Sequence, residues 1–430
     1  MFRSGLLTDV EARGLIQDIA SPEELDAHFA DPAGAMRTVY VGFDPTADSL
    51  HVGSLLPLLA LRRVQLAGHR PIVLVGGGTG LIGDPSGKTG ERSLNPKDQV
   101  AAWAERLKGQ VRPFLDFDRG RNAAVLADNY EWLSQLDLIS FLRDIGKHFA
   151  VGAMIARESV RARMGRADGG ISYTEFSYQA LQAYDFMNLL QHYDCTVQFG
   201  GSDQWGNITA GIDLIRRITG RAAYGLTLPL VTKTDGTKFG KTESGTIWLD
   251  AAKTSAYEMY QFWLNTADAD VVRFLRYFTF LAPEAIESLN GQTERAPEKR
   301  EAQRVLAREV TGLVHGDAAV REAEAISAAL FSGEVAALSE RQLDQAVRGL
   351  PTTELTSGEL QCLSLPDVLV RTGLADSKRA ARELLSRGAV QINGRREDAS
   401  TAAVSRDASL FGRYVVLRKG RKTYHVLIVR

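Results

Sequence analysis

Apolar and polar residues along the first eighty positions predict a β-strand, a helix and a second β-strand. The apolar run Val39–Phe43 ends in the turn residues Asp44–Thr46, and the apolar run Leu55–Leu66 has the length of a helix. A third run, Pro71–Val75, has the length of a strand. Because Pro57 lies inside the second run, the helix either begins shortly before it or is kinked. Strand, helix and strand in this order form a βαβ unit with an expected right-handed crossover, so the pattern predicts an α/β fold with a parallel sheet.

The start of the predicted helix is a candidate nucleotide site. Asp48 and Ser49 precede the apolar run and are residues that cap helices. Free N–H groups and the helix dipole favour an anion there, and His51 adds a donor. Gly53 has no Cβ, so we expect a nucleotide phosphate over the helix start with its base stacked at this glycine. The alternative is that His51 only caps the helix and that Gly53 allows close packing of a neighbouring segment.

A glycine-rich loop, residues 76–89, follows the second predicted strand. Gly78, Gly80 and Gly83 match the dinucleotide-binding spacing, but turn residues follow where a helix should open. The end of the loop resembles a phosphate-binding P-loop that is one residue too short. A glycine loop at the carboxyl end of a strand remains, and open α/β sheets bind ligands there. Asp84 in this loop is a candidate partner for a substrate ammonium group, or it only forms the turn before a proline.

The middle of the chain is predicted to be mostly helical. Leu138–Phe149 and Ala150–Met164 carry apolar residues at helical spacing, which suits either a core or a subunit contact. Farther along, Tyr178, Gln182 and Asp185 fall on one helix face at i, i+4 and i+7. Their aromatic neighbours indicate a polar pocket in an apolar wall, although a polar stripe facing water gives the same spacing.

A second strand, glycine loop and helix follow one another after residue 195. Thr196–Phe199 is a short predicted strand, Gly200–Asn207 is the loop, and Ile208–Ile218 is the helix. Asp203 is placed to accept hydrogen bonds from ribose hydroxyls, and Gln204 to reach a carboxyl group. A turn capped by its own polar residues is the alternative.

The stretch 233–245 is poor in apolar residues and rich in Gly, Thr and Lys, which is typical of a mobile loop. Lys238 and Lys241 lie three residues apart in it and suit a polyphosphate that arrives and leaves. A merely solvated loop is the alternative interpretation.

The last part of the chain is predicted to be a separate basic module. Asp250–Gly349 has the pattern of a helical domain, and Leu350–Glu359, with Pro, Thr and Gly, is a predicted linker. Residues 361–430 contain 14 Lys+Arg and 6 Asp+Glu, whereas the whole chain has a net charge of −1. A basic module on an acidic body favours a polyanion as partner, here RNA, although a solvated charged face is the alternative.

This module has a predicted helix and strands that present the basic residues. Gly388–Gly394 reads as a strand entering an Asn-Gly turn, and Tyr414–Arg418 and Tyr424–Val429 read as strands. The residues expected to contact the RNA backbone are Lys378, Arg379, Arg382, Arg395, Arg396, Lys419, Arg421 and Lys422.

Composition places the chain among ordinary globular proteins. It has 430 residues, of which 44% are hydrophobic and 24% charged, enough for two or three domains. Cys195 and Cys362 match no metal-ligand spacing, which favours a reducing compartment. Because we see no basic segment leading into an apolar one and no apolar run of bilayer length, we expect a cytoplasmic protein without a membrane partner.

Taken together, these stretches resemble the bacterial tyrosyl-tRNA synthetases, a family of class I aminoacyl-tRNA synthetases, along essentially the whole chain. The class signature His-Ile-Gly-His corresponds to His51-Val52-Gly53-Ser54, and Lys-Met-Ser-Lys-Ser corresponds to Lys238-Phe239-Gly240-Lys241-Thr242. Each signature is weak alone, but their order among the flanking stretches 40–46, 80–87 and 200–207 is specific. The last domain resembles the small α-L RNA-binding module of bacterial members.

The resemblance implies an enzyme that activates L-tyrosine with ATP, accompanied by Mg²⁺, and transfers tyrosine to the 3′ end of tRNA(Tyr). The implied tyrosine-binding residues are Tyr40, Asp84, Tyr178, Gln182, Asp185 and Gln204. The implied ATP-binding residues are Asp44, His51, Gly53, Ser54, Gly201, Asp203 and Lys241. The implied catalytic residues, which would stabilise the phosphates, are Thr46, His51, Lys88, Arg92, Lys238 and Lys241. No metal-ligand set in the protein is expected. The assignment requires Tyr40 to lie near Asp185, and His51 near Gly201.

The resemblance also implies a domain order and a homodimer with its contact in the helices of residues 100–170. The expected domains are a Rossmann-like parallel-sheet catalytic domain (1–245) with a helical insertion (about 100–190) and the lysine loop (233–245), a helical anticodon-arm domain (246–350), a linker (351–361) and an α+β RNA-binding domain (362–430).

The chain departs from the two signatures. Ser54 stands where the second His is usual, so we expect a modest change in ATP affinity, and Phe239 and Gly240 replace Met and Ser. Two alternatives are a tryptophanyl-type synthetase, against which Tyr40 and Asp185 favour a phenol, and a non-catalytic RNA-binding protein on a synthetase scaffold. A nicotinamide-dependent enzyme would rest only on the glycine spacing.

Overall fold

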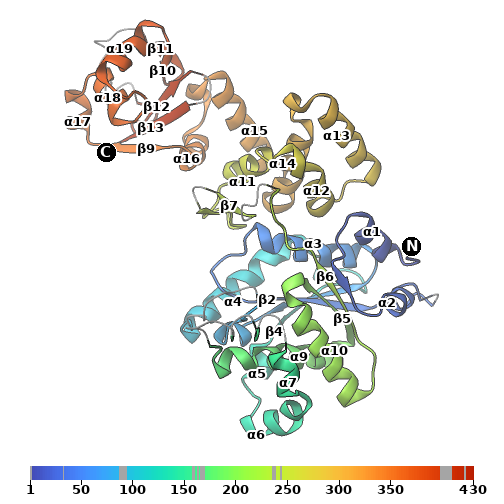
Figure 1. Cartoon of the computed structure of the whole chain (residues 1–430). Helices are drawn as coiled ribbons and strands as arrows, with labels where there is room; N and C mark the ends of the chain where they lie inside the picture. Colours follow the sequence, from blue (N-terminus) through green and yellow to red (C-terminus); the bar gives the residue numbers. More distant parts are fainter. Residues whose placement is uncertain are drawn as a thin grey trace. The chain divides into compact units, whose positions relative to one another are not determined.

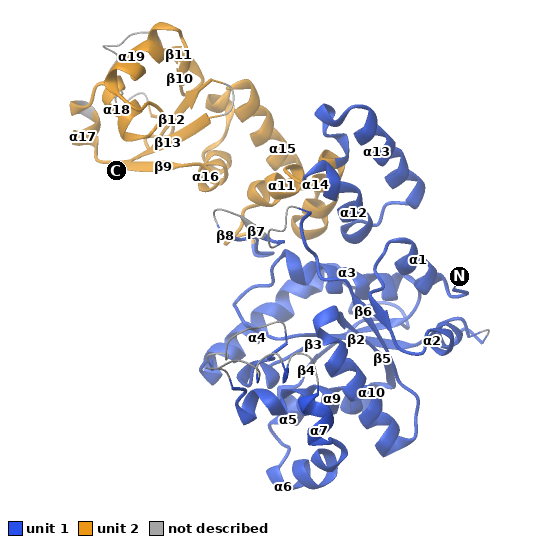
Figure 2. Cartoon of the chain, viewed as in Figure 1, with its two compact units in different colours: residues 1–250, 267–302 blue, residues 251–266, 303–430 orange. Residues whose placement is uncertain are grey.

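The structure is a computed structural model, and Figure 1 shows the whole chain. It describes residues 2–31, 33–86, 94–156, 160–161, 164, 170–234, 239–242, 245–397, 409–420 and 423–430. The chain forms two compact units, coloured separately in Figure 2. Unit 1 comprises residues 1–250 and 267–302, and unit 2 comprises residues 251–266 and 303–430.

A six-stranded sheet is the centre of unit 1. Its strand order is β1-β6-β5-β2-β3-β4, and all neighbours pair in parallel except β1 with β6. The strands are β1 (Asp18–Ile19), β2 (Thr38–Phe43), β3 (Arg70–Val75), β4 (Val125–Asp128), β5 (Cys195–Gly201) and β6 (Tyr224–Leu228). In this register Tyr40 of β2 stands between Ile72 of β3 and Gln198 of β5. The parallel-sheet prediction is confirmed, and three strands predicted from apolar runs are present as β2, β3 and β5.

Helices cover both faces of this sheet (Figure 1). The helices of unit 1 are α1 (Gly5–Ala12), α2 (Pro22–Phe29), α3 (Val52–Leu66), α4 (Lys97–Val111), α5 (Tyr130–Leu133), α6 (Leu138–Ser140), α7 (Val151–Ile155), α9 (Tyr173–Tyr193), α10 (Trp205–Thr219), α12 (Asp268–Phe278) and α13 (Pro283–Arg295). Tyr40, Ile72 and Leu74 join residues of α9 and α10 in one buried apolar cluster. Since side chains alternate along a strand, Val39 and Val41 face the opposite side of the sheet, toward α3.

The helix after β2 differs from its prediction at the N-terminus. It begins at Val52 with His51 as N-cap, and Pro57 lies inside it. Asp48, predicted as a cap, instead pairs with Arg106 of α4 at 2.8 Å. The Ser49 hydroxyl, also predicted as a cap, donates to the carbonyl of Leu50 at 2.8 Å. Both side chains have found partners outside the helix, so the cap prediction was wrong.

The predicted helical stretch 100–170 contains an unpredicted strand and shorter helices than expected. The strand is β4, which pairs with β3 at the edge of the sheet. Leu138–Phe149 is divided into α6, one π-helical turn (Phe141–Ile145) and a 3₁₀ turn (Gly146–His148). In the stretch Ala150–Met164 the structure describes residues 150–156, 160, 161 and 164. Helix α7 covers Val151–Ile155.

Unit 2 contains helices followed by a mixed sheet. Its helices are α11 (Ala256–Leu264), α14 (Glu301–His315, whose first two residues belong to unit 1), α15 (Asp317–Ser332), α16 (Glu340–Arg348), α17 (Ser357–Cys362), α18 (Leu365–Arg371) and α19 (Lys378–Ser386). Its sheet has the order β11-β10-β12-β13-β9, with β9 (Thr352–Leu355), β10 (Val390–Ile392), β11 (Arg395–Glu397), β12 (Tyr414–Lys419) and β13 (Thr423–Val429). Asn393 and Gly394 have positive φ between β10 and β11, as an Asn-Gly hairpin turn requires.

The predicted linker belongs to this sheet. Thr352–Leu355 pairs in parallel with β13, and α17 follows it, so the interpretation of residues 351–361 as a linker was wrong. The two compact units are coarser than the four predicted segments, because α12 and α13 group with unit 1 and the C-terminal sheet groups with the remaining helices. None of the described helices is both long and apolar enough to span a bilayer.

Candidate active site

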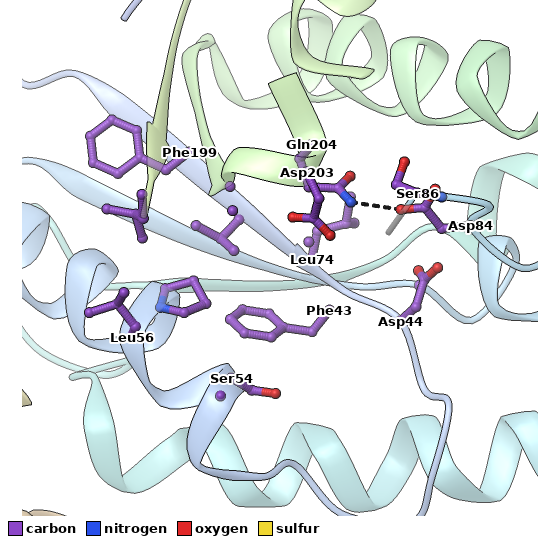
Figure 3. Close-up of a pocket in the computed structure, with 18 of the residues that line it drawn as sticks. Phe43, Asp44, Ser54, Leu56, Leu74, Asp84, Ser86, Phe199, Asp203 and Gln204 are labelled. Atoms are coloured by element: carbon purple, nitrogen blue, oxygen red, sulfur yellow. Dashed lines mark hydrogen bonds between the residues drawn. The ribbon is translucent and has the colours of Figure 1, made fainter. Parts of the chain in front are cut away.

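A cleft of about 590 Å³ opens where the parallel strands β2, β3 and β5 end, together with the loops that follow them (Figure 3). Carboxyl ends of parallel strands meet at one edge of a sheet, so residues far apart in sequence converge there. The predicted site residues that line the cleft are Tyr40, Asp44, His51, Gly53, Ser54, Asp84, Tyr178, Gln182, Asp185, Gly201, Asp203 and Gln204. Tyr40 and Asp185 thus share one cleft, as do His51 and Gly201.

The first turn of α3 forms one wall of the cleft. The Gly53 N–H donates to Nδ1 of His51 at 2.9 Å, and a ring nitrogen that accepts carries no proton. In the neutral ring Nε2 is therefore the donor, and the His51 side chain is exposed. A Cβ on residue 53 would lie 2.6 Å from Cε1 of His51, so glycine at this position is what allows the imidazole to fold over the helix start.

The deepest part of the cleft holds a phenol and a carboxyl group. Tyr40 and Asp185 are each 1% exposed, and the Tyr40 hydroxyl has no hydrogen-bond partner among the described residues. Asp185 accepts from Nδ2 of Asn129 at 2.9 Å and from Nε1 of Trp132 at 2.7 Å. Burial raises the pKa of Asp185 to about 8, against the lowering effect of these two hydrogen bonds. Burial, reinforced by Asp185, also raises the pKa of Tyr40 well above its usual value, so its hydroxyl stays protonated.

A chain of hydrogen bonds connects Asp185 to Asp44, the residue after β2. The Tyr178 hydroxyl donates to Oδ2 of Asp44 at 2.7 Å, and the Thr79 hydroxyl donates to Oδ1 at 2.7 Å. Nδ2 of Asn129 donates to the Thr79 hydroxyl at 2.8 Å and also to Asp185, so Asn129 joins the two groups. Asp44, predicted as an ATP contact, therefore holds Tyr178 and Thr79.

A second polar group lies across the cleft. Nε2 of Gln204 donates to Oδ2 of Asp84 at 2.7 Å, and the Ser86 N–H donates to Oδ1 at 2.9 Å, as Figure 3 shows for the side-chain pair. Nδ2 of Asn207 donates to Oε1 of Gln182 at 3.0 Å and to Oε1 of Gln204 at 3.1 Å. Amide and carboxylate groups thus face the cleft from three separate elements and can bind the charged ends of an amino acid.

Glycines keep the cleft open between these groups. A Cβ on Gly42, which lines the cleft, would meet no atom within 4 Å, so this position borders open space. A Cβ on Gly200 would lie 3.1 Å from Cβ of Gln204, and one on Gly201 would lie 2.6 Å from Oδ1 of Asp203. The Asp203 carboxylate lies beside Gln204 in Figure 3 and is exposed.

Several predicted residues do not fall on this surface. Thr46 is absent from the lining, and its N–H donates to the carbonyl of Asp44 at 2.9 Å. Lys88, Arg92 and Lys238, and the side chain of Lys241, lie outside the described residues.

Asn129 and Trp132 were missed from the sequence. Both follow β4 at the same sheet edge as the other site residues, so the signal for them was this strand, and the strand was not predicted. Had β4 been predicted, the polar residues Asp128 and Asn129 at its carboxyl end would have made this segment a candidate part of the site.

The predicted RNA-binding residues of unit 2 differ in accessibility. Lys378, Arg379, Arg382, Arg395 and Arg396 are exposed. Lys419 is partly buried, and its Nζ donates to the carbonyl of Leu374 at 2.7 Å. Arg421 and Lys422 lie outside the described residues.

Comparison with known proteins gives matches over nearly the whole chain. Residues 34–332 match the family "tRNA synthetases class I (W and Y)", and residues 342–427 match the "Tyrosine--tRNA ligase SYY-like C-terminal domain". The tyrosine–tRNA ligase of Desulfitobacterium hafniense (strain DSM 10664 / DCB-2) is 53% identical over 98% of this chain and 99% of its own length. Tyrosine–tRNA ligase 1 of Bacillus subtilis (strain 168) is 53% identical over 99% of both chains.

A solved structure agrees with the sequence matches. The C-terminally truncated mitochondrial tyrosyl-tRNA synthetase of Aspergillus nidulans is 31% identical, with a TM-score of 0.69, over 76% of this chain and 95% of that one. Full-length matches to ligases for tyrosine count against the two alternatives, a tryptophanyl-type enzyme and a non-catalytic protein.

Proposed function

Because this chain belongs to the tyrosine–tRNA ligase family of class I tRNA synthetases, its reaction is the ligation of tyrosine to tRNA, and we propose how its residues divide that work. In the first step the tyrosine carboxylate attacks the α-phosphorus of ATP, a P–O bond forms, and the bond to pyrophosphate breaks. In the second step a terminal ribose hydroxyl of tRNA(Tyr) takes the tyrosyl group, and AMP leaves.

The deep end of the cleft is the proposed site of the substrate phenol. The observation that carries this assignment is the buried hydroxyl of Tyr40 beside Asp185, which has no hydrogen-bond partner in the part of the chain that the structure describes. Buried polar groups are nearly always hydrogen-bonded, so an orphan at the bottom of a cleft indicates a ligand group that completes it. A phenolic hydroxyl has one donor and acceptor lone pairs, and so it can bond both partners at once.

The second polar group of the cleft is the proposed site of the amino-acid end. Asp84, with Tyr178 and Gln182, would hold the ammonium group, and Gln204 would lie by the carboxylate. The hydrogen bond between Gln204 and Asp84 supports this, because it places a donor for a carboxylate next to an acceptor for an ammonium group.

The start of α3 and the end of β5 are the proposed ATP site. Nε2 of His51, the positive end of the α3 dipole and the position of Ser54 suit the phosphates, and Gly201 with Asp203 suits the ribose. Lys238 and Lys241, with Thr46, Lys88 and Arg92, are proposed to stabilise charge on the leaving pyrophosphate. Mg²⁺ would arrive on the ATP phosphates, because it usually binds through substrate phosphates rather than all-protein cages.

The chemistry needs no general base, because a carboxylate is already a nucleophile. The protein contributes positioning and charge stabilisation, which is the usual division in phosphoryl-type transfers. ATP, tRNA and a reduced thiol at Cys195 are consistent with a cytoplasmic protein.

We also propose that the chain forms a homodimer through the segment 138–155. Large apolar side chains are exposed along it, namely Leu138 (68%), Ile139 (67%), Leu142 (44%), Val151 (59%) and Ile155 (38%). Contiguous exposed apolar residues typically mark an interaction surface. Ile139→Glu should shift the sedimentation coefficient to that of a monomer.

The exposed residues Lys378, Arg379, Arg382, Arg395 and Arg396 are the proposed RNA contacts of the C-terminal domain. If these residues contact the RNA phosphates, the affinity for tRNA should fall as the salt concentration rises.

The amino-acid assignment is tested by pyrophosphate exchange with each of the standard amino acids. We expect exchange with tyrosine alone. Exchange that is faster with tryptophan or phenylalanine than with tyrosine would refute the proposed phenol site.

A further inference from the structure

The start of the lysine loop is bound to the first turn of α12. Asp270 on this helix is 3% exposed, and Thr234 at the beginning of the loop donates to it twice. The Thr234 hydroxyl donates to Oδ1 at 2.6 Å, and the Thr234 N–H lies 3.1 Å from Oδ2. A buried carboxylate thus fixes both the side chain and the main chain of one loop residue.

Arg273, one turn farther along α12, adds a contact to the main chain of the loop. It pairs with Asp270, and its Nη2 donates to the carbonyl of Thr232 at 2.6 Å. Hydrogen bonds in which one partner is charged are about twice as strong as neutral ones. The main chain at residues 232 and 234 is therefore held by two charged side chains of one helix.

The far side of the same loop also contacts α12. The ring of Phe239 stacks on Phe278, with centroids 5.4 Å apart and planes 12° apart, and meets Phe274 edge-on at 5.2 Å. Gly240 follows with φ +77°, and a Cβ there would lie 2.8 Å from Cγ2 of Val52. Phe239 also lines the catalytic cleft, so the segment between the two lysines is fixed next to the proposed ATP site.

Helix α12 is itself tied to the body of unit 1 at its other end. Nη2 of Arg63, on α3, donates to the carbonyl of Thr279 at 2.6 Å, and Nη2 of Arg13 donates to the carbonyl of Leu281 at 2.9 Å. Arg63 is 4% exposed and lies with its guanidinium carbon 4.5 Å from the centre of the Phe280 ring. Because α3 begins at Val52, directly after its N-cap His51, α12 and the residues that follow it contact both the helix of the first signature and the loop of the second.

We propose that α12 positions the lysine loop for the ATP step, with Asp270 and Arg273 holding its beginning and Phe274 and Phe278 holding Phe239. These are positioning residues, since they act through the loop. The proposal rests on the proposed role of Lys238 and Lys241. It follows physically because preorganised cations stabilise a transition state only when they are held in place, and a small misplacement costs up to about a hundredfold in rate.

The test uses four variants of the full chain in tyrosine-dependent pyrophosphate exchange. Thr234→Val removes one hydroxyl from an exposed residue and should lower kcat/KM for ATP by about tenfold, the effect of one hydrogen bond to a charged group. Asp270→Asn removes the charge and should lower it by about tenfold to a hundredfold. The matched controls are Thr234→Ser, which keeps the hydroxyl, and Glu284→Gln, which changes an exposed carboxylate of the next helix, α13; both should stay within about twofold.

Two readouts separate positioning from a loss of folding. Tyrosine affinity by equilibrium dialysis should be unchanged in all four variants, because neither Thr234 nor Asp270 lines the cleft that holds the proposed tyrosine site. In a Lys241→Ala background, Thr234→Val and Asp270→Asn should have almost no further effect, because residues that act as a unit are not additive.

Each outcome decides the matter. Full activity of Thr234→Val, or equal additional losses with and without Lys241, would overturn the positioning role. Full activity of Lys241→Ala alone would overturn the proposed function of the loop, and the positioning role with it.

Discussion

The buried carboxyl group of Asp185 should make the stability of unit 1 depend on pH, and the substitution Asp185→Asn should remove this dependence. Its pKa is about 8 in the folded protein and close to 3.8 when exposed in the unfolded chain. Between these two pH values, folding is therefore accompanied by the uptake of a proton. The contribution of Asp185 to the free energy of unfolding is complete below the unfolded pKa and disappears as the pH rises through the folded pKa.

The size of the effect follows from linkage. Each pH unit between the two values changes the free energy of unfolding by about 1.4 kcal/mol, so raising the pH from 6 to 9 should cost about 2–3 kcal/mol. Asp185→Asn does not titrate and should lack this slope. Its absolute stability should also fall, by about 1–3 kcal/mol, because both oxygens of Asp185 accept hydrogen bonds and an amide NH₂ must face one of the donors.

The measurement is urea unfolding at pH 6, 7, 8 and 9, read by hydrogen exchange at peptides from β2 and α9, so that it reports on unit 1. Asp118→Asn, an exposed carboxylate of the same unit, is the control for the change in net charge. The difference between wild type and Asp185→Asn should grow steadily toward low pH, while Asp118→Asn stays parallel to wild type. Parallel curves for all three proteins would refute the raised pKa and, with it, the description of the pocket floor as a desolvated site.

Three further predictions test other parts of the molecule. Tyr40→Phe should lower kcat/KM for tyrosine by about tenfold or more in pyrophosphate exchange and reduce the preference over phenylalanine, and an unchanged preference would contradict the role of the orphan hydroxyl. Gly53→Ala should displace His51, raise KM for ATP and lower the melting temperature, because its Cβ would lie 2.6 Å from the imidazole; an unchanged KM would count against His51 in the ATP site. Truncation after Gly349 should keep pyrophosphate exchange and reduce tRNA charging. Truncation after residue 361 should yield a less soluble protein, because it leaves β9 without its partner β13; equal solubility of the two truncated proteins would contradict the pairing of β9.

The parts of the fold that local patterns determine could be predicted from the sequence. β2, β3 and β5 are apolar runs bounded by turn residues, and α9 is long enough to show its period clearly. Tyr178, Gln182 and Asp185 came together in the cleft because one helix face carries all three.

The parts that depend on distant partners could not be predicted. β4 has four residues, and what defines it as a strand is its pairing with β3, some fifty residues earlier. Asp48 has the residue type and position of a helix cap, but in the folded chain it pairs with Arg106. Residues 352–355 have the composition of a linker, but they pair with β13. In each case a long-range contact outweighs a weak local preference.

Charge counted along the sequence also differs from charge available on the surface. The C-terminal domain is strongly basic, but Arg418 is 7% exposed and its Nη2 donates to the carbonyl of Phe331, at the end of α15. Lys419 donates to a carbonyl as well. Carbonyls at helix ends have no partner within the helix, and a basic side chain can satisfy them. Some of the positive charge that predicted an RNA surface therefore holds the domain together.

The floor of the cleft connects stability with specificity. Without a ligand, the buried Tyr40 hydroxyl has no hydrogen-bond partner within the described ranges, and the Asp185 carboxyl lies in surroundings that disfavour its charge. The unsatisfied hydroxyl of Tyr40 costs the free protein about 1–3 kcal/mol. A phenol that enters the gap gives this hydroxyl a partner, whereas an amino acid with the same ring and no hydroxyl fills the volume and leaves the Tyr40 hydroxyl unsatisfied. The site can therefore reject phenylalanine without a steric block, because the penalty for the wrong ligand is already present in the folded protein.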